Sequence, residues 1–135
     1  MGMYTQVKGY LNVDSIGFET VGLAQARLNE AKLSFLKDDT INCSRKAIVT
    51  GDTFLHVGFN ASAFIFIGTE FKNYCRDAEA WLDYLLKYFP NAEGRVDFQY
   101  EEDECATSRI IARGEIVRQE EVGVKTEGYG NSFND

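Results

Sequence analysis

The chain has 135 residues, a length typical of one domain, and its 44% hydrophobic content supports a folded core. Its 14 basic and 21 acidic residues give a formal net charge of −7, which disfavours DNA or RNA as a partner because their phosphates are negatively charged too. No apolar run approaches the roughly 18 residues of a membrane span, and the N-terminus lacks a signal-peptide pattern, so we expect a cytoplasmic protein without a membrane partner.

Cysteine and histidine are too sparse for a metal centre. The cysteines are Cys43, Cys75 and Cys105, and the single histidine is His56. Their wide spacing gives no close set of zinc ligands, so we expect neither a metal nor a cofactor. The odd cysteine count and the missing export signal predict three free thiols.

The first half of the chain predicts one helix among several strands. Residues 3–13 alternate as a strand does, and residues 23–36 repeat apolar side chains at helical spacing. Three β-type runs follow, at residues 45–51, 53–60 and 63–71. The last run contains Phe64-Ile-Phe-Ile67, which is apolar on both faces and predicts a central strand covered by helices.

The second half predicts a helix and a hairpin. Residues 77–88 carry an apolar stripe, and the Phe89-Pro90 step ends the helix. Residues 94–101 and 106–119 read as two paired strands, with the acidic run Glu101–Glu104 as their turn. Residues 123–135 are polar and glycine-rich and read as a flexible tail.

This order of elements, β-α-β-β-β-α-β-β, predicts the α+β class. We expect residues 1–122 to form a single domain in which two helices pack on one side of an antiparallel sheet. The side chains expected in its core are Phe64, Phe66, Trp81 and Leu85.

Arg109 and Arg113 are the strongest indication of a binding site. Both lie in the run read as a strand, four residues apart, so they would share one face about 13 Å apart at about 3.3 Å per residue. That spacing suits a small phosphorylated nucleotide. Ordinary ion pairs with Asp97 or Glu101 on an exposed sheet explain the two arginines equally well.

Ile111 and Val117 are expected on the same face as these arginines. A face that mixes arginine with large apolar side chains is typical of a covered surface, such as a pocket or a subunit interface. Since a domain of this size rarely encloses a nucleotide alone, we expect at least a dimer. Asn91, just after Pro90, offers an amide that can contact a base, although asparagine is also a common turn residue.

Catalytic signatures are missing from the sequence. His56 is the one candidate for a neutral-pH general base, but no serine or cysteine nucleophile stands at motif spacing from it. The glycines form no phosphate-binding loop, and Glu101–Glu104 lacks the ligand spacing of a calcium loop. We therefore expect a binding protein and not an enzyme.

The segment from Trp81 to Arg113 resembles a known family. Lys87-Tyr-Phe-Pro-Asn-Ala-Glu-Gly-Arg95 and Ser108-Arg-Ile-Ile-Ala-Arg113 look like phage-encoded Thoeris anti-defence proteins of the first class. The likeness covers about a quarter of the chain closely and the order of elements loosely.

The resemblance implies a sponge that binds, without cleaving it, the cyclic ADP-ribose isomer made by a bacterial TIR-domain immune sensor in the host cytoplasm. Some members of that family also hold cyclic di- or trinucleotides at separate sites in a larger oligomer. The resemblance further implies that Arg109 and Arg113 bind the diphosphate, and that Trp81 and Asn91 hold the adenine in a pocket between protomers. From its position on a helix alone, Trp81 is more often a core residue than a platform for a ligand.

Two other functions stay open on the sequence alone. An acidic protein can imitate nucleic acid and inhibit a bacterial defence protein, as anti-CRISPR proteins do, with Glu101–Glu104 as part of the phosphate mimic. A small hydrolase acting on a nucleotide is the third reading, although it lacks an evident base and nucleophile.

Overall fold

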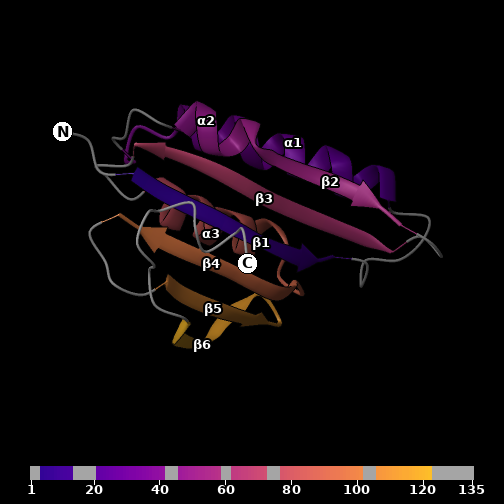
Figure 1. The fold of residues 1–135 in the computed structure, drawn as a ribbon. Helices are drawn as coiled ribbons and strands as arrows, with labels where there is room; N and C mark the ends of the chain where they lie inside the picture. The colour runs from indigo at the N-terminus through magenta and orange to yellow at the C-terminus, as the bar shows by residue number, and fades with distance from the viewer. Residues whose placement is uncertain are drawn as a thin grey trace.

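A six-stranded antiparallel sheet with three helices packed alongside it makes up the computed structural model, which describes residues 4–13, 21–41, 46–58, 62–72, 77–101 and 106–122 (Figure 1). The elements in chain order are β1 (Tyr4–Asn12), α1 (Val21–Lys37), α2 (Lys46–Gly51), β2 (Thr53–Val57), β3 (Ala63–Lys72), α3 (Asp77–Tyr88), β4 (Glu93–Tyr100), β5 (Ala106–Ala112) and β6 (Glu115–Val122). The expected α+β class and antiparallel sheet are confirmed, with one more short helix than the sequence suggested.

The strand order in the sheet is β2-β3-β1-β4-β5-β6. Strand β1 pairs with β3 on one side and with β4 on the other, so the N-terminal strand lies inside the sheet. Apart from the inserted α2, the elements from β1 to β4 follow the ferredoxin-like β-α-β-β-α-β order, and β5 and β6 widen the sheet beyond it. The helices contact one another and lie together behind the sheet in Figure 1.

The core lies between the helices and the sheet face that they cover. Side chains alternate along each strand, so in β1 Val7 and Leu11 are buried while Tyr10 faces away from the helices. The largest fully buried side chains are Trp81, Phe35, Phe89, Phe98, Leu11, Leu28, Ile65, Leu82 and Leu85.

The expectation that β3 is covered on both faces is wrong. Trp81 and Leu85 are buried as expected, but Phe66 is 45% exposed and Phe64 is half-buried. The reason is that α1, α2 and α3 all pack on the opposite face. Of the described residues, none covers the aromatic side chains of β3 with a second layer.

Residues 45–51, expected to be a strand, instead contain the short helix α2. Val49 and Thr50 of this helix are buried. The Thr50 hydroxyl donates to the Lys46 carbonyl oxygen at 2.8 Å, and the Thr53 hydroxyl donates to the Val49 carbonyl oxygen at 2.8 Å. Packing and these local bonds override the β-branched preference of the run.

The single strand expected over residues 106–119 is wrong as well. The chain reverses at Arg113 and Gly114, whose φ angles are 54° and 74°. Two consecutive positive φ angles are the signature of a two-residue type I′ hairpin turn. Asparagine or aspartate usually precedes the glycine in such turns, so Arg-Gly gave no clear signal in the sequence.

Replacing Gly114 with alanine should lower the free energy of unfolding by about 1–3 kcal/mol, because the residue needs a positive φ. A Cβ atom there would also lie 2.3 Å from the Pro90 carbonyl oxygen. Chemical denaturation measures the loss. Gly68→Ala is the matched control, because Gly68 has no positive φ and open space around it, and this variant should lose no stability.

Asp38 ties the end of α1 to α3. Its carboxylate accepts hydrogen bonds from the Thr40 hydroxyl and the Tyr84 hydroxyl, and the Thr40 amide donates to it at 2.9 Å. These bonds, with Thr40 the largest cause, lower the pKa of Asp38 to about 2. The bond to Asp38 raises the pKa of Tyr84 to about 12.

The pH dependence of stability should show this contact. A lowered carboxyl pKa contributes stability that is present above the unfolded pKa of about 4 and is lost as pH falls through about 2. The Tyr84 contribution is present below pH 10 and is lost as pH rises through about 12. Asp38→Asn should therefore flatten the stability curve between pH 4 and 2 in denaturant titrations.

Several expectations fall outside the described residues. They concern the three free thiols, most of the acidic run Glu101–Glu104 and the tail at residues 123–135. Among the helices that are described, none has the length and apolar character needed to cross a membrane.

Candidate ligand-binding groove

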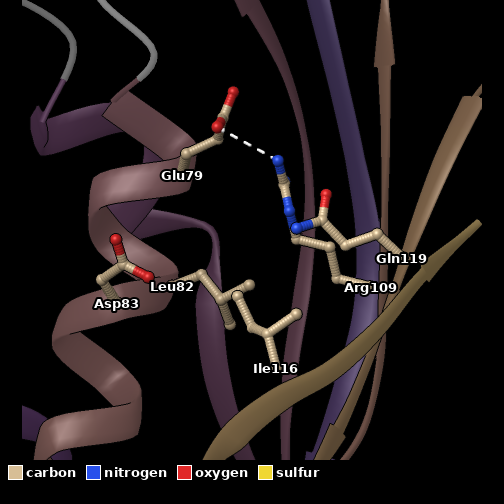
Figure 2. A pocket seen from close by; sticks show the side chains of 6 residues that line it. All are labelled: Glu79, Leu82, Asp83, Arg109, Ile116 and Gln119. Carbon is tan, nitrogen blue, oxygen red and sulfur yellow. Dashed lines mark hydrogen bonds and ion pairs between the residues drawn. The ribbon is translucent and has the colours of Figure 1, made fainter.

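A groove separates α3 from the β5–β6 hairpin. Its deeper part has a volume of about 190 Å³ and is lined by Glu79, Leu82, Asp83, Arg109, Ile116 and Gln119 (Figure 2). A more open hollow of about 520 Å³ shares Asp83 and Ile116 with it and adds Leu86, Lys87, Gly114 and Glu115. We call the two together the α3–hairpin groove.

Helix spacing and a strand irregularity bring these side chains together. Glu79, Leu82 and Asp83 are three and four residues apart, so they face the same way from α3. The pairing of β5 with β6 shifts register between Ile110 and Ile111. An unbroken strand would place Ile116 and Gln119 on opposite faces. Because of the shift, both side chains line the groove.

Arg109 is held firmly on β5 beside the groove. Its Nη2 atom lies 3.1 Å from Oε1 of Glu79, and its side chain is 13% exposed. The guanidinium carbon lies 4.4 Å from the ring centroid of Phe98, within cation–π range. The Nη1 atom is buried, and no described residue accepts a hydrogen bond from it. The donors of Nη1 thus have no acceptor among the described residues, and a ligand would reach them only after the side chains around this atom move.

Two carboxylates flank this guanidinium from α3. Glu79 accepts a hydrogen bond from Arg109 with one oxygen (Figure 2). Its other oxygen accepts from the Tyr100 hydroxyl. Desolvation raises the pKa of Asp83, the charge of Arg109 opposes that rise, and Glu79 adds to it. The groove thus offers one strong cation among several acceptors of hydrogen bonds.

The chemistry of the lining suits binding. A guanidinium fits phosphate oxygens, whereas carboxylate and amide oxygens accept from sugar hydroxyls and amino groups. Among the described residues that line the deeper part, none is a serine, a cysteine or a histidine. His56 is exposed on β2, with its ring centroid 6.1 Å from that of Phe66, and does not line the groove. Among the described residues, no group of three potential ligands could hold a metal ion.

The structure separates the two arginines that the sequence placed on one strand face. Arg109 lines the deeper part of the groove, whereas Arg113 is exposed in the hairpin turn. Their expected straight-line spacing along a strand is wrong, because the chain reverses at Arg113. Ile111 is 2% exposed and Val117 is 58% exposed, so they do not form the shared surface expected of them either.

Trp81 does not line the groove but lies in the core. It is fully buried, its Nε1 donates to the Thr53 hydroxyl at 2.8 Å, and its ring centroid lies 5.1 Å from that of Phe35. Neither face of the indole is accessible for a ligand base. The sequence had left its role as a core residue open, and the packing agrees with that reading.

Asn91 lies near the hairpin turn and not beside Arg109. It is exposed in the turn after α3, and the Gly114 amide donates to the carbonyl oxygen of the adjacent Ala92 at 2.9 Å. Gly114 lines the open hollow, so Asn91 and Arg113 flank one end of the groove while Arg109 lies in its deeper part.

Comparison with known proteins gives no relative. No family model, curated protein or solved structure matches this chain. The resemblance to Thoeris anti-defence proteins therefore stays an interpretation of the segment from Trp81 to Arg113.

Glu79, Asp83 and Gln119 were not among the site residues expected from sequence. The i and i+4 spacing of Glu79 and Asp83 on the expected helix was visible, but it is also typical of a solvated helix face. Gln119 reaches the groove only because the hairpin turns at Arg113 and shifts register, and neither feature has a clear sequence signal.

Proposed function

We propose that the protein is a phage anti-defence sponge. It captures a cyclic ADP-ribose isomer, the signal made by a bacterial TIR-domain immune sensor, and holds it uncleaved in the α3–hairpin groove, in the cytoplasm of the infected host. The observation that carries the proposal is Arg109, a mostly buried guanidinium that lines the groove and whose Nη1 atom has no acceptor among the described residues.

The groove suits the parts of such a ligand. The guanidinium of Arg109 would meet a phosphate oxygen in a charge-assisted hydrogen bond. Glu79, Asp83 and Gln119 supply acceptors for ribose hydroxyls, and Leu82 and Ile116 supply apolar contacts. The open hollow of about 520 Å³ lies within the size range of small-molecule sites.

The lining of the deeper part supports capture without cleavage by a serine or cysteine nucleophile. A hydrolase of the serine or cysteine type needs an activated hydroxyl or thiol beside a base. The six side chains of the deeper part include neither a hydroxyl nor a thiol. In this proposal the ligand leaves the protein chemically unchanged.

Glu79 competes with the ligand phosphate for Arg109, and this competition gives a test. Glu79→Gln keeps the shape of the side chain but removes its charge, so the guanidinium becomes a stronger anion donor. We expect capture of the cyclic ADP-ribose signal to tighten roughly tenfold, or about 1.4 kcal/mol. Titration calorimetry at fixed salt measures the change.

Glu120→Gln is the matched control for this test. Glu120 pairs with Arg118 at 3.4 Å, an exposed contact away from the groove lining, so its neutralisation changes the net charge equally but should not change affinity. Equal gains in the two variants would mean that only the overall charge acts, and weaker capture by Glu79→Gln would contradict the assigned role of Arg109.

The nucleic-acid mimic has no comparable support. Of the acidic run Glu101–Glu104, only Glu101 is described, and its carboxylate accepts a hydrogen bond from the Tyr4 amide at 3.0 Å. We therefore advance a single function.

A further inference from the structure

The sheet face opposite the helices carries a row of side chains that runs across all six strands. Strand pairing places one residue from each strand beside the next. The described helices lie behind the other face (Figure 1), and only at the edge strand β2 does a helix side chain reach the row, where the Lys32 amino group of α1 lies 5.7 Å from the ring centroid of Phe54. The members of this open-face row, from β2 to β6, are Phe54, Phe66, Tyr10, Arg95, Ile110 and Arg118.

The open-face row has two chemically different halves. Phe54, Phe66 and Tyr10 are 60%, 45% and 44% exposed, an unusual amount of aromatic surface for three neighbouring side chains. The other half contains the arginines at positions 95 and 118, whose side chains are 45% and 65% exposed.

We propose that this face binds a second copy of the chain, sheet against sheet, in a two-fold dimer. The two-fold axis of this dimer would lie between the two facing sheets and run parallel to the strands. It would pass over the midpoint of the row, between β1 and β4. The rotation reverses the row, so the aromatic half of each copy lies opposite the arginine half of the other. Tyr10 then faces Arg95 of the second copy, and Phe66 faces Ile110.

Chemical complementarity supports this occupant. Arginine over an aromatic ring is a favourable contact that strengthens when water is excluded. A two-fold axis forms every such contact twice, as is typical of isologous interfaces. Arg95 and Arg118 can turn toward a partner at small cost, because their present partners Asp97 and Glu120 form exposed ion pairs that contribute little.

A single-stranded nucleic acid fits the same face less well. Bases can stack on exposed aromatic rings of a sheet of this topology. However, the chain has a net charge of −7, and the carboxylates of Asp97 and Glu120 lie beside the two arginines. A polyanion would meet repulsion there, whereas a second copy brings its own arginines to the rings.

Sedimentation equilibrium over 1–200 µM tests the proposal on the unmodified chain. We expect a monomer–dimer equilibrium within this range. Phe66→Arg should weaken the dimer at least tenfold, because it places a charge opposite Ile110. Leu33→Arg on α1, where Leu33 is 56% exposed, is the control and should leave the dimer intact.

A second substitution tests the orientation. In the Phe66→Arg, Ile110→Glu double variant, each new arginine faces a new glutamate of the other copy, so dimerisation should return. If each Phe66 instead faced Phe66 of the other copy, the double variant would place two arginines opposite each other. That dimer would not be rescued.

Four results would overturn the proposal. The first two are an unmodified chain that is still monomeric at 200 µM, and a dimer that is not weakened by a Phe66→Arg variant that folds. The other two are a double variant that folds but stays monomeric, and a monomeric chain whose Phe66 binds oligouridine in fluorescence anisotropy. Thermal melts confirm folding, and Tyr10→Ser serves as the disrupting variant if Phe66→Arg does not fold.

Discussion

Arg109→Ala should weaken capture of the cyclic ADP-ribose signal about ten- to a hundred-fold. A hydrogen bond to a charged group is worth roughly 1.5–3 kcal/mol, and Arg109 is the one cation among the described residues that line the deeper part of the groove. Arg109→Lys should recover only part of the affinity, since an ammonium lacks the planar fork of donors. Titration calorimetry measures each affinity.

Two arginine variants serve as controls for this result. Arg118→Ala removes an ion-paired arginine from the same hairpin but on the uncovered face, so it should not change the affinity for the signal. Arg113→Ala should have an intermediate effect, because Arg113 is exposed at the end of the groove. An unchanged affinity of folded Arg109→Ala would mean that this arginine only pairs with Glu79, and the proposed site would be wrong.

Trp81→Ala should lower the free energy of unfolding by about 3–5 kcal/mol. The indole is fully buried against Phe35, and its removal leaves a cavity together with the Thr53 hydroxyl that it now contacts. Urea denaturation followed by circular dichroism gives the loss, because this variant removes the only tryptophan.

An exposed aromatic residue serves as the control for the loss of a buried one. Phe54 is 60% exposed, so Phe54→Ala should change stability by less than about 1 kcal/mol. The fraction of Trp81→Ala that remains folded should still capture the signal. A stable Trp81→Ala that has lost only ligand capture would restore the role in base binding that the sequence suggested.

Strong periodicity made much of the fold predictable. The helix over residues 77–88 and the strands around β1, β3 and β4 follow from apolar patterns of period 3.6 and 2, which long elements show clearly. The prediction for residues 45–51 failed because seven residues rich in β-branched side chains are too few to show a reliable period. The prediction that Phe64 and Phe66 are buried failed for a different reason. Apolar side chains on both faces of a strand do not reveal whether a second layer covers both faces.

The candidate site was less predictable, because it depends on one turn. Reading residues 106–119 as a single strand put Arg113 on the face of Arg109 and hid the groove partners Ile116 and Gln119. The positive φ angle of Arg113 is costly for a side chain of its kind and is compensated by contacts of the turn, such as that between Gly114 and Ala92. Such tertiary compensation cannot be read from local sequence.

The most direct measurement is a capture-and-release experiment. The protein is mixed with slightly less than an equimolar amount of the TIR-domain product and filtered through a membrane that retains the protein. The retained fraction is then heated to release bound nucleotide. Mass analysis measures the nucleotide in the filtrate and in the heated fraction. We expect the filtrate to be depleted and heating to return the nucleotide with unchanged mass and retention time, with little depletion by Arg109→Ala. Nucleotide that stays in the filtrate would contradict binding, and nucleotide returned in cleaved form would contradict sequestration.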